Sequence, residues 1–196
     1  MDIADMTFTI VDVETTGLSP AMGDRVCEIG AVKLKGGAMS GTFHSMIDPQ
    51  RPISPAASAK NGITPEMLKG APAFAAIAKD IHAFLSGTVL VAQNAQFDLD
   101  FINNEFRLVA FPEWNGYVID TISLARRVVP GLPSYNLDLL ARTFGVTFTS
   151  RHRSMGDVEA TADIFQKCVG RLKEAGAARS LEELIKIGEP WRRTRR

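Results

Sequence analysis

The chain has 196 residues, which is long enough for one sizeable hydrophobic core and short for two ordinary domains. Its apolar fraction of 45% and charged fraction of 22% are typical of a water-soluble globular protein and exclude the disordered and fibrous classes. Lysine plus arginine total 22, and aspartate plus glutamate total 22, so the net charge gives no indication of a nucleic-acid partner.

Membrane and secretion signals are absent from the sequence. No stretch is long and apolar enough to span a bilayer, and the opening residues lack the basic and apolar regions of a signal peptide. We therefore expect a cytoplasmic protein without a membrane partner. The two cysteines, Cys27 and Cys168, lie far apart and outside any Cys-x-x-Cys or Cys/His cluster, so we expect reduced, buried side chains.

The first elements in the chain are predicted strands. Extended runs cover residues 6–13, 26–34 and 42–47, and Gly36 and Gly37 form the expected hairpin turn between the last two. Short connections between the three runs predict an antiparallel meander.

The end of the first strand carries two acids on an apolar face. Met6, Phe8, Ile10, Asp12 and Glu14 have the same parity, so an extended strand points all five side chains to one side of the sheet. A buried charge without a partner costs on the order of several kcal/mol. The two carboxylates therefore need a partner that the strand itself does not supply.

Helices and strands alternate in the second half. A proline-rich connection over residues 49–72 precedes a predicted helix over 74–85, and 88–92 is predicted to be a buried strand. Asn94 stands where a helix N-cap would be, so a strand, a turn and a helix carry the chain to Asp98.

The remaining elements complete the predicted architecture. A short strand at residues 117–120 runs into a helix through Leu124, Asn136 opens another helix, and a long final helix has an apolar stripe from Val158 to Leu172. Strands followed by alternating strands and helices predict an α/β fold, a mixed sheet flanked by helices.

Three polar segments are candidates for chemistry. Asp12 and Glu14 lie roughly 6 to 7 Å apart on one face, which suits a hard cation, and Gly17 permits close approach by a ligand. Asp98 is expected in the first turn of a helix, where the helix dipole favours an acid without any function. His152 precedes the last helix and Asp157 lies near its start. Taken singly, each segment is more simply explained by ordinary polar residues without a function.

Taken together, the segments indicate a metal site. Four carboxylates with one histidine form a hard oxygen set that suits Mg²⁺ or Mn²⁺ better than zinc. Two such ions about 4 Å apart would neutralise the acids and clamp a phosphodiester for attack by water. A neutral imidazole, here that of His152, would take the proton from that water.

The segments stand in the order Asp12-Val-Glu14-Thr-Thr-Gly17, Asn94-Ala-Gln-Phe-Asp98 and His152-Arg-Ser-Met-Gly-Asp157. In their order and His-x4-Asp spacing they resemble the motifs of the DEDDh (DnaQ-like) 3′-to-5′ exonucleases, typified by the DNA polymerase III epsilon subunit. The resemblance implies a ribonuclease H-like fold with a mixed five-stranded sheet, and release of nucleoside 5′-monophosphates. It also implies that Asp12, Glu14, Asp98 and Asp157 bind two Mg²⁺ or Mn²⁺ ions and that His152 is the general base.

Substrate contacts follow from the same resemblance. Thr15 and Gly17 in the turn are expected near the substrate, and Leu18 resembles an apolar residue that packs on the terminal base, with a buried turn residue as the alternative. Asn61 departs from the His-Gly-Ile form common in the family, at a position near the terminal nucleotide. Arg151 and Arg153 flank His152, where they either contact phosphates or are solvated loop residues.

The expected substrate is a single-stranded DNA 3′ end, in proofreading or repair. RNA, as in the ribonuclease T and oligoribonuclease branches, is the alternative, because sugar discrimination depends on pocket shape. A non-catalytic binding module on the same fold is the second alternative. A DNA polymerase subunit as partner rests on family analogy alone.

The domain prediction places an exonuclease domain at residues 1–174 and a C-terminal extension at 175–196. Ser180 and Glu183 have the spacing of a helix capping box. The last six residues, 191–196, include four arginines, expected to be either a solvated tail or an interaction segment.

Overall fold

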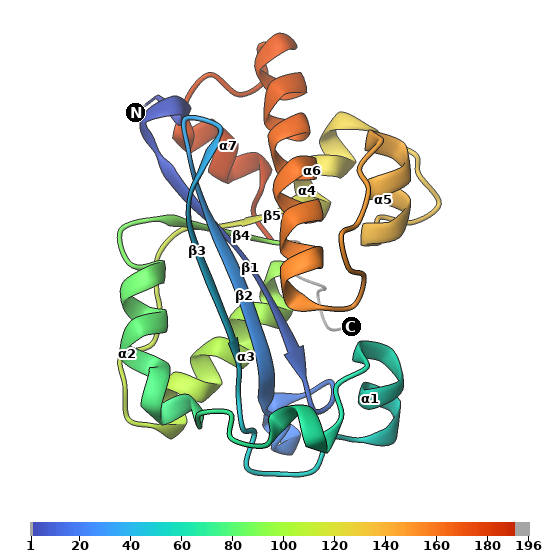
Figure 1. Cartoon of the computed structure of the whole chain (residues 1–196). Helices are drawn as coiled ribbons and strands as arrows, with labels where there is room; N and C mark the ends of the chain where they lie inside the picture. Colours follow the sequence, from blue (N-terminus) through green and yellow to red (C-terminus); the bar gives the residue numbers. More distant parts are fainter. Residues whose placement is uncertain (1, 191–196) are drawn as a thin grey trace.

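The computed structural model describes residues 2–190, so the arginine-rich segment at 191–196 lies outside the described residues. One five-stranded sheet has the order β3-β2-β1-β4-β5. Its strands are β1 (Thr7–Thr15), β2 (Val26–Lys35), β3 (Ala38–Met46), β4 (Val89–Ala92) and β5 (Val118–Asp120). Strands β1 to β3 are antiparallel, whereas β4 and β5 run parallel to β1 (Figure 1). The predicted meander and mixed sheet are confirmed, although β3 begins four residues earlier than the predicted run.

Helices cover both faces of the sheet (Figure 1). The helices on one side are α2 (Phe74–Leu85) and α3 (Ala95–Leu108). Those on the other side are α4 (Thr121–Val128), α5 (Leu137–Phe144), α6 (Ser154–Glu174) and α7 (Leu181–Ile187). Among residues 2–190, none of these helices is long and apolar enough to cross a membrane.

Strand β1 divides its side chains between two cores, as its alternating pattern requires. Phe8 and Ile10 belong to the core under α4 to α7, and Met6 packs against it. Val11 and Val13 belong to the core under α2 and α3. The parity predicted for the acid-bearing face is confirmed, so Asp12 and Glu14 leave the sheet on the α6 side.

The proline-rich connection contains a helix that the sequence did not lead us to expect. This helix is α1 (Pro55–Asn61), with Pro55 in its first turn and the Ser54 hydroxyl accepting the Ala57 N–H. This Ser-Pro start is a known helix signal. Short 3-10 turns also occur at Ile3–Asp5, Pro20–Met22 and Pro65–Leu68.

Asn94 is the N-cap residue of α3, as predicted, but its side chain makes no capping hydrogen bond. It adopts a left-handed conformation with a φ of 65°, and its backbone N–H donates to the Asp120 carboxylate at 3.1 Å. Asp120 also accepts the Ile122 N–H at 2.8 Å and so caps α4. One carboxylate therefore fixes the turns that follow both parallel strands β4 and β5.

The other caps agree with prediction. The Asn136 side chain accepts the Leu139 N–H at 2.8 Å, and Ser180 with Glu183 forms the capping box of α7. Buried Leu181 and Leu184 place α7 in the core beneath α4 and α6. The segment predicted as an extension thus packs on the domain.

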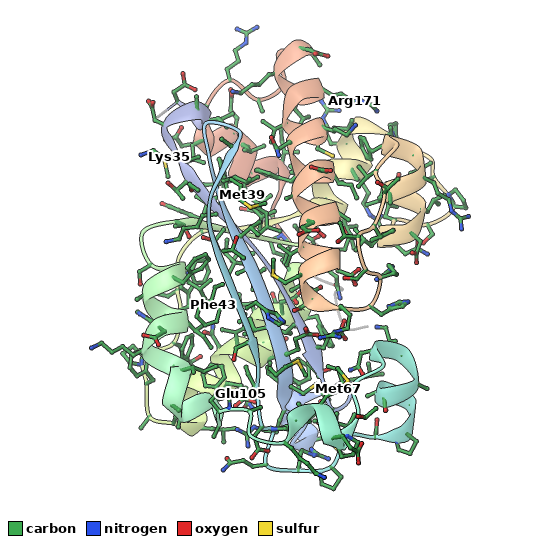
Figure 2. The ribbon with its side chains drawn as sticks, in the orientation of Figure 1. Lys35, Met39, Phe43, Met67, Glu105 and Arg171 are labelled. Atoms are coloured by element: carbon green, nitrogen blue, oxygen red, sulfur yellow. The ribbon has the colours of Figure 1, made fainter. Side chains whose placement is uncertain are left out.

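Buried ionic and thiol groups have distinct environments. Glu105 of α3, labelled in Figure 2, binds the Arg25 guanidinium through two bonds of 2.8 and 2.7 Å and accepts the Val26 N–H. This contact anchors the loop between β1 and β2. Cys27 and Cys168 are buried and free, as predicted, and burial raises the pKa of each thiol to about 12.

Gly30 controls how closely α6 approaches the sheet. It pairs with Asp12 across β1 and β2, and a Cβ at this position would lie 2.8 Å from Ser154 Oγ and 2.9 Å from the Ser154 carbonyl carbon. The missing side chain therefore lets the start of α6 rest against the strand that neighbours Asp12.

We expect Gly30→Ala to lower the free energy of unfolding by about 1 to 3 kcal/mol, because the added methyl group forces α6 away from β2. Urea denaturation measures the change. Gly41→Ala is the matched control in β3, since its Cβ would lie at an ordinary 3.6 Å from the Phe84 ring. Equal stability changes in the two variants would contradict this account of Gly30.

Candidate metal centre

The end of β1 and the start of α6 bring three carboxylates together. One oxygen each from Asp12, Glu14 and Asp157 lies within 4.8 Å of the others. The two β1 residues share a face of the strand, and Asp157 comes from the first turn of α6. We call these three residues the acid cluster. Segments more than 140 positions apart in the sequence therefore meet at one point, as the motif order predicted.

A cleft of about 540 Å³ opens at the acid cluster. All five predicted metal and base residues line it, together with Leu18. Its remaining walls come from β1, the end of α1, the turn after β4, the starts of α3, α4 and α5, and the loops before α5 and α6. The residues concerned are Val13, Lys60, Gln93, Asn94, Phe97, Ile122, Arg126, Ser134, Tyr135, Asn136, Leu137 and Arg151. The cleft is therefore lined by both apolar and cationic side chains around an acidic floor.

The acids of the cluster resist ionisation in the metal-free fold. Burial, followed by the charges of Asp98 and Glu14, raises the pKa of Asp12 well above its ordinary value. Burial and the neighbouring Asp157 charge raise the pKa of Glu14 to about 7. Each carboxylate is thus partly withdrawn from water and faces like charges, so a bound cation would stabilise the ionised forms.

Asp98 lines the same cleft but stands apart from the acid cluster. It is buried in the first turn of α3, and its Oδ1 accepts the Val13 backbone N–H at 3.0 Å. Burial raises the pKa of Asp98, while the Val13 N–H opposes the shift. The structure therefore brings Asp98 to the site without including it in the three-residue group.

Asp157 carries the clearest sign of a missing ligand. Within the described part of the chain, its buried Oδ1 has no hydrogen-bond partner. A buried oxygen of this kind is costly unless an ion or water satisfies it. With the converging hard oxygens of Asp12 and Glu14, this atom makes the residues fit Mg²⁺ or Mn²⁺.

His152 lies at the edge of the cleft in the loop before α6. Its φ of 59° is uncommon for a residue with a side chain, and its Nδ1 lies 3.3 Å from Arg151 Nη1. A guanidinium only donates hydrogen bonds, so the Nδ1 lone pair accepts this contact. The structure thus places the predicted base beside the cluster, with one ring nitrogen covered by Arg151.

The arginines beside His152 form ion pairs within the protein. Arg151 binds Asp157 and Asp138, and Arg153 binds Glu28, with Arg153 Nη2 lying 2.9 Å from the Glu28 carboxylate. Both side chains remain partly exposed to solvent, at 26% for Arg151 and 37% for Arg153.

Glu28 is a functional-site neighbour that sequence reasoning missed. It lies directly opposite Glu14 in the sheet and is 1% exposed. Burial alone would raise its pKa, but hydrogen bonds from Arg153 and His44 hold the pKa of Glu28 below its ordinary value. The available signal was a glutamate inside an otherwise apolar strand. Through Arg153, this charge fixes the start of α6 and the loop that carries His152.

The predicted substrate contacts divide into two groups. Leu18 is 81% exposed beside the cleft, so the alternative of a buried turn residue is wrong. Asn61 is 4% exposed and does not line the cleft, because its amide accepts the Ile63 N–H and donates to the Thr15 carbonyl.

The Thr-Thr-Gly turn is closed by internal contacts. The Thr15 hydroxyl donates to the Gly17 carbonyl at 2.6 Å, and Thr15 is buried. A Cβ at Gly17 would lie 2.3 Å from an Asp24 carboxylate oxygen. The close approach that requires this glycine is therefore that of Asp24, whereas the sequence predicted a ligand.

A family model for RNase_T exonucleases matches residues 9–165. The chain is 38% identical over 183 residues to a PolC-type DNA polymerase III of Oceanobacillus iheyensis, covering 93% of this chain and 13% of that protein. It is 37% identical over 175 residues to a DNA polymerase III subunit epsilon-like protein of Rhodobacter capsulatus, covering 87% and 25%. The chain thus spans a quarter or less of these relatives' length.

Solved structures show the same fold. Exonuclease X in complex with 5′ overhanging duplex DNA has 28% identity and a TM-score of 0.70, covering 92% of this chain and 99% of that chain. E. coli Exonuclease I in complex with a dT13 oligonucleotide has 23% identity and a TM-score of 0.79, covering 93% and 46%. The second likeness shows the fold alone.

Glu14 should make the stability of the metal-free protein depend on pH. Its pKa rises from the ordinary 4.5 to about 7 in the fold, so between these values the folded state holds a proton that the unfolded chain releases. This contribution to the free energy of unfolding therefore falls as the pH rises, and it is smallest above about pH 7.

We expect Glu14→Gln to remove the loss of stability that accompanies ionisation of Glu14. In the presence of a chelator, the melting temperature of the variant should exceed that of the wild type by more at about pH 8 than at about pH 5. Thermal unfolding at the two pH values measures the difference. An offset that stays constant with pH would contradict the raised pKa of Glu14.

Proposed function

We infer that this chain, which belongs to the RNase_T exonuclease family, removes nucleotides from the 3′ ends of single-stranded DNA. The products in this proposal are nucleoside 5′-monophosphates. The observation that carries it is the acid cluster with the unpartnered Asp157 oxygen, next to His152 in an open cleft.

Four carboxylates serve as metal ligands in this proposal. Asp12, Glu14 and Asp157 already converge, and Asp98 lines the same cleft. Two bound Mg²⁺ or Mn²⁺ ions would supply Lewis acidity and neutralise charge on the scissile phosphate. The local positive charge would then come from the ions, which is consistent with a chain of neutral net charge.

His152 acts as the general base. Metal-bound carboxylates are poor bases, whereas a neutral imidazole accepts a proton near physiological pH. The loop before α6 places the ring at the cleft edge, where it takes the proton from the attacking water. Glu28 and Arg153 support this loop from the adjacent strand.

Leu18 and the cleft walls hold the terminal nucleotides. The exposed Leu18 side chain offers an apolar surface for a base, and Phe97 and Ile122 add apolar wall area. Thr15, Gly17 and Asn61 act indirectly by shaping the turn that presents Leu18. The relatives named as DNA polymerase III and the DNA complexes among the structural neighbours support DNA as the substrate and a proofreading or repair role.

End-labelled substrates test the proposal directly. Single-stranded DNA, duplex DNA, mismatched-terminus DNA and short RNA are offered with Mg²⁺ or Mn²⁺, and product sizes are resolved by electrophoresis. We expect single-nucleotide shortening from the 3′ end, fastest on single-stranded DNA. Faster cleavage of RNA than of DNA would identify RNA as the substrate. Binding without cleavage would identify the protein as a non-catalytic binding module.

The acid cluster should be essential for cleavage. We expect Asp12→Ala or Asp157→Ala to abolish metal-dependent nucleotide release, because each removes a ligand from the cluster. Either variant should also unfold at a higher temperature than wild type in a chelator, since carboxylate repulsion is relieved. Asp163→Ala, on the exposed side of α6, is the matched control. Wild-type activity in either cluster variant would refute the proposed site.

His152 should affect rate rather than metal affinity. We expect His152→Ala to slow cleavage roughly 10²- to 10⁴-fold, as for other general bases, while calorimetry shows Mn²⁺ binding nearly unchanged. His82→Ala, in α2 on the opposite face of the sheet, should retain activity. A rate loss of less than ten-fold would remove His152 from the base role.

A further inference from the structure

Arg151 bridges two carboxylates at the mouth of the cleft. Its Nε and Nη2 donate to the two oxygens of Asp138 at 2.8 and 3.2 Å, and its Nη1 donates to Asp157 Oδ2. The guanidinium also lies over the Phe148 ring, with its carbon 5.0 Å from the ring centroid. Its position is therefore fixed by three different residues.

The two carboxylates differ in their surroundings. The Asp138 side chain is 48% exposed and lies outside the acid cluster, whereas Asp157 is 7% exposed and within it. Arg151 thus uses two donors on an acid at the rim and one donor on a proposed metal ligand. In the metal-free protein its positive charge acts on the cluster together with that of Lys60, which lines the same cleft.

A metal ion at the unpartnered Asp157 Oδ1 and Arg151 Nη1 at Oδ2 place two positive charges on one carboxylate. A guanidinium has no acceptor through which it could bind the ion instead. Metal binding therefore weakens the bond from Nη1 to Asp157, while the two bonds to Asp138 hold the rest of the guanidinium in place. A free N–H donor then faces the cleft.

We propose that Arg151 binds a substrate phosphate oxygen and that metal binding at the acid cluster releases it to do so. Nη1 exchanges Asp157 for a non-bridging phosphate oxygen, and Asp138 keeps the guanidinium oriented through the exchange. The same Nη1 lies 3.3 Å from His152 Nδ1 in the metal-free state, so it stands between the proposed base and the acid cluster. This inference rests on the proposed nuclease function.

The exchange predicts opposite effects on two ligands. Removing Arg151 removes the competitor for Asp157, so metal should bind more tightly. It also removes a phosphate contact, so DNA should bind the metal-loaded protein more weakly. A residue that merely supports the loop would weaken both, which makes the pair of signs diagnostic.

Calorimetry of Mn²⁺ binding without DNA measures the first effect. We expect Arg151→Gln to lower the Kd for Mn²⁺ on the order of 5-fold, the loss of one charge-assisted hydrogen bond. Arg142→Gln is the matched control, because Arg142 is exposed on α5 near Asp138 and reports the general effect of removing a charge. An unchanged or raised Kd in Arg151→Gln, or an equal gain in the control, would overturn the proposal.

Binding of a labelled oligo-dT strand in Ca²⁺ measures the second effect, with electrophoresis verifying that the strand stays intact. We expect Arg151→Gln to raise the Kd for DNA on the order of 5- to 10-fold. Arg151→Lys should fall between the variant and wild type, since an ammonium cannot hold Asp138 with two bonds and also reach a phosphate. Arg151→Lys also tests the proposed exchange if Arg151→Gln fails to fold. Unchanged DNA affinity in both variants would overturn the proposal.

The nuclease function and the exchange at Arg151 can be refuted separately. If wild type cleaves none of the nucleic acids, the nuclease function fails whatever the Mn²⁺ affinities are. If wild type cleaves single-stranded DNA but the Arg151 variants change neither affinity in the stated direction, the exchange alone is wrong.

Discussion

Repulsion among the partly buried carboxylates that meet at the end of β1 is the constraint on which the site depends. Asp12 and Glu14 leave the sheet toward α6, and Asp157 meets them from the start of that helix. Packing removes the water that would screen them, so their pKa values rise. The fold holds this arrangement because the two hydrophobic cores on either side of β1 fix the strand, and Gly30 lets α6 rest on its neighbour.

Arg151 and Arg153, on either side of His152, bind different carboxylates. Arg153 binds the buried Glu28, whose partners keep it ionised, so this pair is part of the permanent structure. Arg151 binds Asp157, a proposed metal ligand, and it also binds Asp138. These arginines are paired with individual carboxylates rather than spread over a broad basic surface, which is consistent with the neutral net charge of the chain.

In the loop after β1, the residues that hold the loop in place differ from the residue that is exposed at the cleft. Asp24 approaches Gly17, Asn61 holds the Thr15 carbonyl, and Glu105 anchors Arg25 at the end of the loop. These contacts face inward, and Leu18 alone of the turn residues is highly exposed at the cleft. All of these contacts lie within residues 9–165, the part of the chain that the exonuclease family model matches.

Features with a local cause could be read directly from the amino-acid order. Strand parity, the Asn136 cap, the capping box of Ser180 and Glu183, and the order of the acidic motifs depend on neighbouring residues and were predicted correctly. Long-range contacts settled the rest. Glu28 and Arg153 are 125 residues apart, Asp120 fixes the turn at Asn94, and Asn61 turns inward while Arg151 reaches the cluster. No sequence pattern encodes such pairings, because each depends on which distant group the folded chain places within hydrogen-bonding distance.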